Sequence, residues 1–456
     1  MPIYRDGMRV PALAVLLCLI APIASALAAA PEIGAGFEVE RYELSLTPDP
    51  STKSVAGTEA IRFRSLKDGL RSIAFSPNAL TIDSASLGGR TVGVSSGKEA
   101  VVFELPAPVN KGRASTLIVR YHGVPKRGVT ATTESMYTSY FACDWMLCLQ
   151  DSPGDKALFA LDLRLPKGMS SLSVGEAMPL RRAPDGKVIH RWRSSRPYSP
   201  YLFGFATGRF ARAVEDSGRG QLIYLGEGAS EAELRRLFAE TPAMVRFLSD
   251  KAGTGLPSGR YSQLLVPGRE AQEAATYSLI GKGELDRSAG KPQTDWIIVH
   301  ELAHQYWGNL VTSSTWRDFW LNEGITTFMT AAWKEHRFGP AAYRAELDVA
   351  RARLARAREA GWDKPLAFAG DYPSLPLRRA VQYSKGALFM AHLRTAIGEE
   401  AFWAGLKAFT SENAYGTVTS ADFQKAMERA SGRDLSALFA EWVYDRAGEQ
   451  VARSGH

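Results

Sequence analysis

Residues 296–312 read W-I-I-V-H-E-L-A-H-Q-Y-W-G-N-L-V-T. Within this stretch lies the pattern H-E-x-x-H, formed by His300, Glu301 and His304. Residues four apart share one face of a helix, so both imidazoles can point at one metal ion while Glu301 serves as a general base. The alternative is a helix with two ordinary histidines and a surface glutamate. Because the chain has only 7 histidines in 456 residues, composition alone would produce the pattern in roughly one such chain in a hundred, which favours a metal site.

Apolar residues flank the pattern, at 296–299 before it and at 306–307 after it. The helix is therefore expected to be largely buried and to start at Thr294 and Asp295. A buried polar group without a partner costs about 1–3 kcal/mol, so the two histidines and the glutamate need a partner. A zinc ion would be such a partner.

Glu323 is the predicted third ligand. It lies in the apolar-rich segment 320–328, within a second helix expected from about 318 to 336. A buried carboxylate is costly there unless it meets a cation, and the connection 308–317 is long enough for the chain to fold back onto the first helix. The two histidines and this glutamate would then hold one zinc ion per chain and leave a fourth position open, as in catalytic zinc sites.

Several segments resemble the aminopeptidase N family of gluzincin zinc metallopeptidases. Residues 300–312 resemble the family's zinc helix and 316–324 its third-ligand segment, while Y-S-K-G at 383–386 is similar to the family's Tyr-x-Lys-Gly. In the N-terminal half, 197–205 resembles the strand that closes the first domain, and 156–159 the end of a further motif. The resemblance covers most of the chain, in a short form without the family's C-terminal helical domain. It implies an α+β fold, in which an N-terminal antiparallel β domain precedes a mostly helical, thermolysin-like zinc peptidase domain.

The same resemblance implies a zinc metallopeptidase, most specifically an aminopeptidase that removes N-terminal residues from peptides. Glu301 would be the general base, and Tyr383 would stabilise the tetrahedral intermediate. Glu273 would bind the free amino group of the substrate. The segment around it reads E-A-Q-E-A and lacks the glycine, methionine and asparagine of the family's Gly-x-Met-Glu-Asn strand, and Glu270 is a rival alignment. A polar side chain that the family places in the first domain, near Ser139 here, is also missing.

Two other functions remain open at this point. The altered strand around Glu273 also fits an endopeptidase, or a peptidase of altered specificity. A binding protein with a vestigial site is the third interpretation, but the complete ligand set, Glu301 and Tyr383 argue against it. In each case the expected partners are peptides, and the sequence carries no signal for an oligomeric state.

Composition and periodicity predict two domains. With 45% hydrophobic residues and a net charge of +7, the chain suits a globular protein, and no Lys/Arg run is dense enough for nucleic-acid binding. Strand-like alternation, as at 117–121, continues from residue 37 to about 212. We expect a β domain over 31–215 and the catalytic domain over 216–456, with the boundary near 214–220. Further helices are expected at 231–249, 340–360, 381–397, 399–411, 420–430 and 434–446.

The N-terminus predicts export. Arg5 and Arg9 precede an uncharged stretch over 10–30 that ends in small-x-small cleavage sites, so residues 1–30 resemble a signal peptide. We expect a periplasmic or secreted protein without stable membrane insertion after cleavage, and the alternative is an uncleaved N-terminal anchor. In an exported protein, Cys143 and Cys148 can form a disulfide, and the alternative is two free thiols.

Four further residues carry expectations of their own. Asp318 is expected either to orient a ligand histidine or to cap a helix. His336 and His392 are expected on helix surfaces rather than at the metal. Gly324 is expected to serve packing beside the third ligand.

Overall fold

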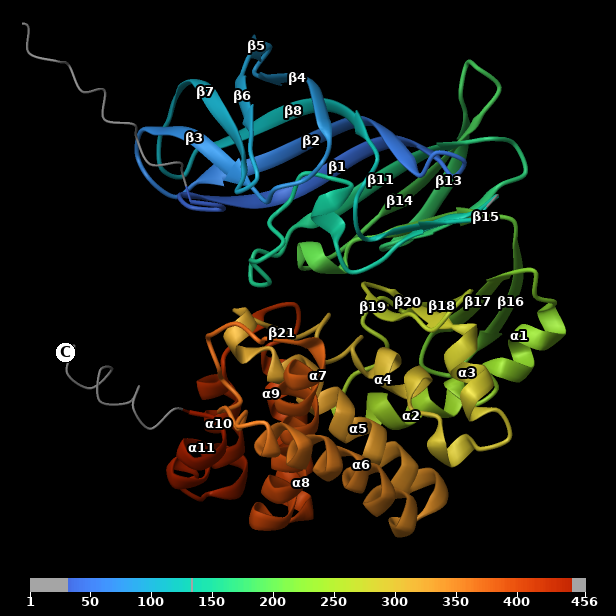
Figure 1. Cartoon of the computed structure of the whole chain (residues 1–456), viewed down its shortest axis with the longest axis vertical. Coiled ribbons are helices and arrows are strands. Elements are labelled where there is room, and N and C mark those ends of the chain that lie inside the picture. Colours follow the sequence, from blue (N-terminus) through green and yellow to red (C-terminus); the bar gives the residue numbers. More distant parts are fainter. Residues whose placement is uncertain (1–31, 133, 445–456) are drawn as a thin grey trace, which may run out of the picture.

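The computed structural model describes residues 32–132 and 134–444, which form two parts stacked one above the other in Figure 1. The predicted signal peptide, residues 1–30, lies outside the described residues. Among the residues that are described, no helix combines the length and apolarity needed to cross a membrane.

A large mixed sheet forms the centre of the first part. The buried side chains of β1, among them Tyr42, Leu44 and Leu46, alternate along the strand as expected for a sheet with one covered face. Most strand pairs are antiparallel, but β1 and β11 pair in parallel. The prediction of a purely antiparallel domain is therefore wrong in this detail. The strand order is β13 (Glu176–Arg182), β14 (Val188–Arg193), β11 (Leu158–Leu165), β1 (Phe37–Asp49), β2 (Ser54–Ser65), β8 (Ala114–Gly123), β4 (Thr81–Leu87) and β5 (Arg90–Thr91).

Two smaller sheets complete the first part. One sheet has the order β3 (Leu70–Phe75), β7 (Val101–Val109), β6 (Gly93–Ser96), and the other has the order β12 (Ser170–Ser173), β15 (Phe205–Gly208), β10 (Met136–Thr138), β9 (Val129–Ala131). Single turns of 3-10 helix are η1 (Ala142–Asp144) and η2 (Pro200–Leu202).

A disulfide joins Cys143 to Cys148 in the segment that follows β10, with the two Cα atoms 5.0 Å apart. Of the two alternatives that the sequence left open, the structure therefore has the disulfide.

A five-stranded sheet opens the second part. Its edge strand β19 pairs only with β20, and this edge faces the first part (Figure 1). The boundary predicted near 214–220 falls in the turn between β16 and β17, which are neighbours in this sheet. The strand order is β16 (Phe210–Asp216), β17 (Gln221–Glu227), β18 (Arg260–Val266), β20 (Tyr277–Gly281) and β19 (Ala271–Ala274).

Helices make up most of the remainder. The helix expected at 231–249 is two helices, and the one expected at 381–397 begins earlier with a π-helical turn, η5 (Arg379–Lys385). The helices are α1 (Glu231–Leu237), α2 (Thr241–Ala252), α3 (Lys282–Ser288), α4 (Ile297–Ala303), α5 (Trp320–Phe338), α6 (Pro340–Glu359), α7 (Leu375–Arg378), α8 (Gly386–Ile397), α9 (Glu399–Glu412), α10 (Ser420–Ser431) and α11 (Ser436–Trp442). Short elements are η3 (Pro292–Thr294), η4 (Trp316–Asp318), β21 (Thr312–Ser313) and β22 (Thr417–Val418).

Hydrogen bonds tie the two parts together beside the H-E-x-x-H sequence. The Nζ of Lys156, in the first part, donates to the carbonyl oxygens of Asn309, Leu310 and Gly416 at 3.3, 3.3 and 2.8 Å. The N–H of Asn309 in turn donates to the carbonyl oxygen of His304 at 2.9 Å. The first part therefore holds the loop that follows the H-E-x-x-H helix.

Candidate active site

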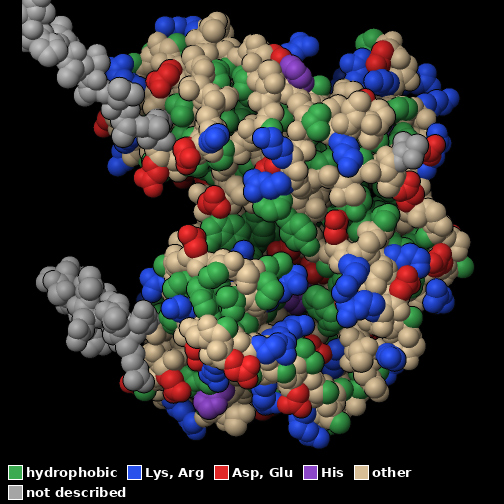
Figure 2. Space-filling model, viewed as in Figure 1, with side chains coloured by type: hydrophobic (Ala, Val, Ile, Leu, Met, Phe, Trp, Pro, Cys, Tyr) green, Lys and Arg blue, Asp and Glu red, His purple; other side chains and the backbone are tan. Residues whose placement is uncertain are grey.

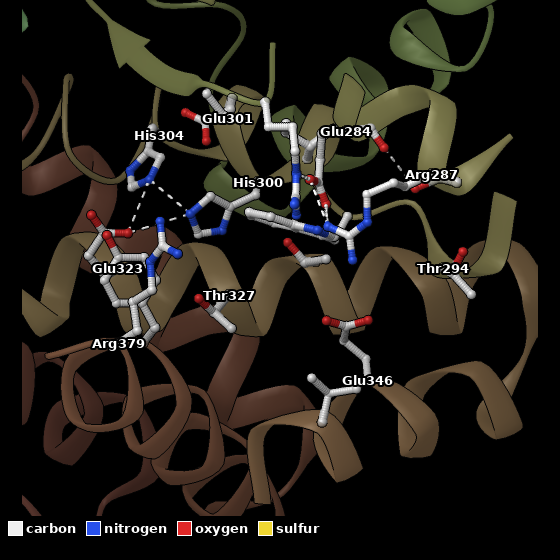
Figure 3. A pocket seen from close by; sticks show the side chains of 18 of the residues that line it. Glu284, Arg287, Thr294, His300, Glu301, His304, Glu323, Thr327, Glu346 and Arg379 are labelled. Atoms are coloured by element: carbon white, nitrogen blue, oxygen red, sulfur yellow. Dashed lines mark hydrogen bonds and ion pairs between the residues drawn. The ribbon is translucent and has the colours of Figure 1, made fainter. Parts of the chain in front are cut away.

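The three predicted metal ligands converge between α4 and α5. The Nε2 atoms of His300 and His304 lie 3.3 Å apart, and they lie 3.5 and 3.4 Å from Oε2 of Glu323. Nδ1 of His304 lies 3.1 Å from the carbonyl oxygen of Trp307, which fixes the ring with Nε2 toward the glutamate. Figure 3 shows the three side chains pointing toward one another.

Glu323 reaches the histidines because its helix, α5, packs closely against α8. A Cβ atom on Gly324 would lie 2.8 Å from the Cα of Gly386, the first residue of α8. The two glycines therefore let the backbones of α5 and α8 touch at the level of the site. The contact brings Glu323 beside η5, whose π-helical turn carries Tyr383.

The donor set fits a zinc ion. Two imidazole nitrogens and a carboxylate oxygen lie within 4.8 Å of one another, and all three side chains are buried. Burial raises the pKa of Glu323, but the charge of His304 and hydrogen bonds from both histidines outweigh it and hold that pKa well below its usual range. A carboxylate that stays ionised beside two imidazoles is the ligand set expected for zinc.

Glu301 points into the same space but belongs to no ion pair. Its Oε2 is buried and has no hydrogen-bond partner among the described residues. Burial, more than any neighbouring charge, raises the pKa of this carboxyl well above its ordinary value. A raised pKa of this kind suits a group that takes and returns a proton.

Tyr383 and Glu273 lie on either side of this centre. The ring of Tyr383 stacks on His300 with centroids 6.0 Å apart, and burial is the main cause that raises the pKa of its phenol, which keeps it a hydrogen-bond donor. Glu273 lies on edge strand β19, and one of its oxygens lies within 4.8 Å of ligand atoms of Glu301 and His304. Burial raises the pKa of Glu273 to about 7.

These residues line a cavity of about 740 Å³ between the two parts. Figure 2 shows a hollow there, with acidic side chains in its depth and Lys and Arg side chains along its edge. Glu273 lines the cavity, whereas Glu270 is not among the lining residues. The strand therefore presents Glu273, not the rival Glu270, to the site.

Tyr140 is the contribution of the first part to the cavity wall. Its backbone is left-handed, with φ of 56°, its N–H donates to Oε1 of Gln272 at 2.8 Å, and its hydroxyl donates to the carbonyl oxygen of Ala271. The sequence indicated that a polar side chain of the family is missing near Ser139, one residue earlier, and it gave no sign of Tyr140. No motif marks Tyr140, because only tertiary contacts bring it to β19.

Residues 274–442 match the model of the peptidase family M1 domain. These residues are thus similar to a peptidase family M1 domain. The matched segment contains both histidines, Glu323 and Tyr383 of the site. The resemblance to aminopeptidase N and its relatives that the sequence motifs indicated is thereby confirmed.

Related proteins also align with the first part of this chain. Aminopeptidase N of Lactococcus lactis subsp. lactis is 26% identical over 445 residues, which are 89% of this chain and 51% of the relative. Leukotriene A-4 hydrolase of Xenopus laevis is 25% identical over 433 residues, 85% of this chain and 68% of the relative. The chain thus spans about half the length of that aminopeptidase N.

Solved structures show the same two-part fold. The M1 zinc metallopeptidase of Deinococcus radiodurans superposes with a TM-score of 0.75 at 22% identity, covering 90% of this chain and 95% of that one. A mutant of it bound to the substrate Tyr-Ser-Ala gives a TM-score of 0.76 with the same coverage. The α+β fold predicted from the sequence, with its N-terminal β part and helical zinc peptidase part, is confirmed.

Of the two roles expected for Asp318, the structure shows helix capping, at the N-terminus of α10 rather than of its own helix. Its Oδ1 accepts hydrogen bonds from the N–H and the hydroxyl of Ser420, the first residue of α10. Among the described residues it makes no hydrogen bond to a ligand histidine, so that expectation is wrong. His336 stacks on Phe247 and His392 on Trp442, and neither histidine lines the cavity.

Proposed function

We propose that the chain is a zinc-dependent aminopeptidase that hydrolyses the first peptide bond of peptides. The observation that carries the proposal is the convergence, in one cavity, of the His300–His304–Glu323 ligand set with Glu301, Tyr383 and Glu273. One zinc ion per chain would bind at this ligand set. When bound, zinc would activate a water molecule and polarise the scissile carbonyl.

The protein side chains supply the remaining chemistry. Glu301, with its raised pKa, would accept a proton from the attacking water and deliver it to the departing amine. Tyr383 would donate a hydrogen bond to the carbonyl oxygen as that oxygen gains negative charge, an interaction typically worth about 3–4 kcal/mol. The phenol is suited to this role because burial keeps it protonated.

Glu273 would make the enzyme an exopeptidase. An ammonium group in contact with this buried carboxylate would gain a charge-assisted hydrogen bond, and the side chain lies on the His304 side of the metal ligands. Tyr140 lies against the same strand, because its hydroxyl donates a hydrogen bond to the carbonyl oxygen of Ala271. A bound N-terminus would therefore meet Glu273 and the wall that Tyr140 forms, which supports cleavage after one residue.

Glu301→Gln tests the mechanism. We expect the variant to retain zinc by elemental analysis, because Glu301 is not a ligand, and to lose at least about 10²–10⁴-fold in hydrolysis of aminoacyl-naphthylamides. Glu359→Gln, an exposed change at the end of α6, is the matched control. Hydrolysis by Glu301→Gln at close to the unmodified rate would contradict the proposed base, and a chelator should abolish activity of the unmodified protein.

Free and N-acetylated peptides separate the aminopeptidase from the endopeptidase alternative. If Glu273 recognises the ammonium, acetylation should abolish cleavage in a peptide library analysed by mass spectrometry. Equal cleavage of both forms would show an endopeptidase.

We also propose that residues 1–30 direct export to the periplasm or the exterior. We further propose that the chain has two domains, predicted as 31–215 and 216–456, with β16 (Phe210–Asp216) paired in the sheet of the second. The charge pattern and the small-x-small sites support the first proposal. Cell fractionation with N-terminal sequencing should find the mature chain outside the cytoplasm, beginning near residue 29 or 31. A chain that stays in the cytoplasm with residues 1–30 attached would contradict export.

A further inference from the structure

Two arginines line the cavity without a partner. Arg353 lies on α6 and Arg379 at the start of η5, and both side chains are exposed to the open cavity. Within residues 32–132 and 134–444, neither guanidinium makes a hydrogen bond, an ion pair or an aromatic contact. Two unpaired guanidinium groups in one cavity wall offer up to ten N–H donors to an anion.

The other basic side chains of the cavity are already paired. Arg269 and Arg287 both contact Glu284, at 3.1 and 2.9 Å. Glu346, the acidic residue of α6 that lines the cavity, binds the buried Nζ of Lys334 at 2.6 Å. Among the described residues, Arg353 and Arg379 are therefore the cavity-lining arginines that form no ion pair with a carboxylate.

The guanidinium groups of Arg353 and Arg379 are close enough to interact electrostatically. Burial lowers the pKa of Arg353, Glu346 raises it, and the positive charge of Arg379 lowers it again. Arg379 precedes Tyr383 by one helical turn, and in Figure 3 its side chain projects toward the metal ligands beside Glu323.

Glu273 and the arginines lie on different elements of the cavity wall. Glu273 is on β19 and groups with Glu301 and His304, whereas Arg379 is on η5 and Arg353 is on α6. A peptide whose ammonium contacts Glu273 and whose scissile carbonyl lies at the metal would place its next residue toward α6. This direction rests on the aminopeptidase function proposed above.

We propose that Arg379 and Arg353 bind a carboxylate on the residue that follows the scissile bond. The carboxylate has two possible sources, the side chain of an aspartate or glutamate, and the C-terminus of a dipeptide. In both cases a planar guanidinium can bind both carboxylate oxygens. The site would thus favour acidic peptides or dipeptides over neutral, extended ones.

Peptide binding to an inactive protein tests the proposal without relying on hydrolysis. Zinc-loaded Glu301→Gln is titrated calorimetrically with Ala-Glu amide, Ala-Gln amide and Ala-Gln with a free C-terminus. We expect Ala-Glu amide to bind about tenfold more tightly than Ala-Gln amide if a side-chain carboxylate is recognised. Tighter binding of free Ala-Gln than of its amide identifies the C-terminal carboxylate as the source.

Variants of the two arginines, made in the zinc-loaded Glu301→Gln protein, test whether these residues cause the preference for a carboxylate. Arg379→Gln and Arg353→Gln, singly and together, should reduce the ratio of the affinities for charged and neutral peptides toward one. Arg356→Gln removes the same charge from α6 outside the cavity and should keep the ratio. An equal loss in Arg356→Gln, or a ratio near one before any arginine is changed, would overturn the proposal. The single variants preserve the test if the double variant does not fold.

Hydrolysis by the unmodified chain separates this proposal from the function on which it rests. If Ala-Gln amide is never cleaved while the carboxylate preference persists in binding, the aminopeptidase assignment fails and the anion site stands. If both amides are cleaved and bound equally well, the aminopeptidase assignment stands and the anion site fails.

Discussion

At the scale of single residues, the site combines a few side chains that motifs reveal with others that they do not. His300, Glu301 and His304 follow from one short pattern, and Tyr383 from its resemblance to a family motif. Arg379 is only four residues from Tyr383, yet no motif includes it. Its importance depends on a cavity that only the folded chain has.

Tyr383→Phe measures what the phenol contributes. We expect kcat for an aminoacyl-naphthylamide to fall by about 10²–10³-fold with little change in KM, because the hydroxyl would act mainly as negative charge develops on the carbonyl oxygen. Steady-state kinetics give both constants. Tyr372→Phe is the control, since that hydroxyl is also buried but lies outside the cavity wall. A loss expressed only in KM would show that Tyr383 binds substrate rather than stabilising the intermediate.

At the scale of elements, the crossing of α5 and η5–α8 builds the site. The sequence predicted both helices, because apolar residues recur at helical spacing in each. It did not predict that 379–385 forms a π-helical turn, nor that 231–249 divides at residues 238–240. Such local departures depend on packing against neighbouring elements, which a one-dimensional pattern does not record.

Gly324→Ala tests the close crossing. The added Cβ would lie 2.8 Å from the Cα of Gly386, so the helices must separate at the position of Glu323. We expect a loss of about 1–3 kcal/mol in the free energy of unfolding, together with weaker zinc binding, measured by denaturation and by competition with a chelator. Gly255→Ala is the control, because its Cβ would meet only ordinary contacts, the nearest at 3.5 Å. Unchanged zinc affinity in Gly324→Ala would show that the crossing does not position the ligand.

At the scale of the whole molecule, the first part completes the site in the second. Tyr140 reaches the cavity, Tyr201 accepts a hydrogen bond from Nδ2 of Asn322 at 3.0 Å, and Lys156 binds the loop after the zinc helix. These contacts join residues more than a hundred positions apart in the sequence. The metal-binding helices are therefore held from both parts of the fold.

Lys156→Met tests this support. The variant removes the Nζ donor from three carbonyl oxygens, each of which keeps one other hydrogen bond, and we expect the free energy of unfolding to fall by about 1–3 kcal/mol. Activity should fall as well, because the N–H of Asn309 donates to the carbonyl oxygen of His304. Thermal unfolding and kinetics measure both effects, with the exposed Lys167→Met as the control. An unfolding temperature equal to that of the control variant would show that the bridge is dispensable.

The sequence by itself predicted the candidate metal ligands and the candidate general base, and it determined the class of fold and the type of most elements. It could do so because ligand spacing on a helix and hydrophobic periodicity are local properties. Only the tertiary structure decided that Glu273 rather than Glu270 lines the cavity, that Tyr140 forms part of its wall, and that Arg353 and Arg379 form no ion pair among the described residues. These outcomes depend on which side chains meet across the two parts, and on which charges find partners there.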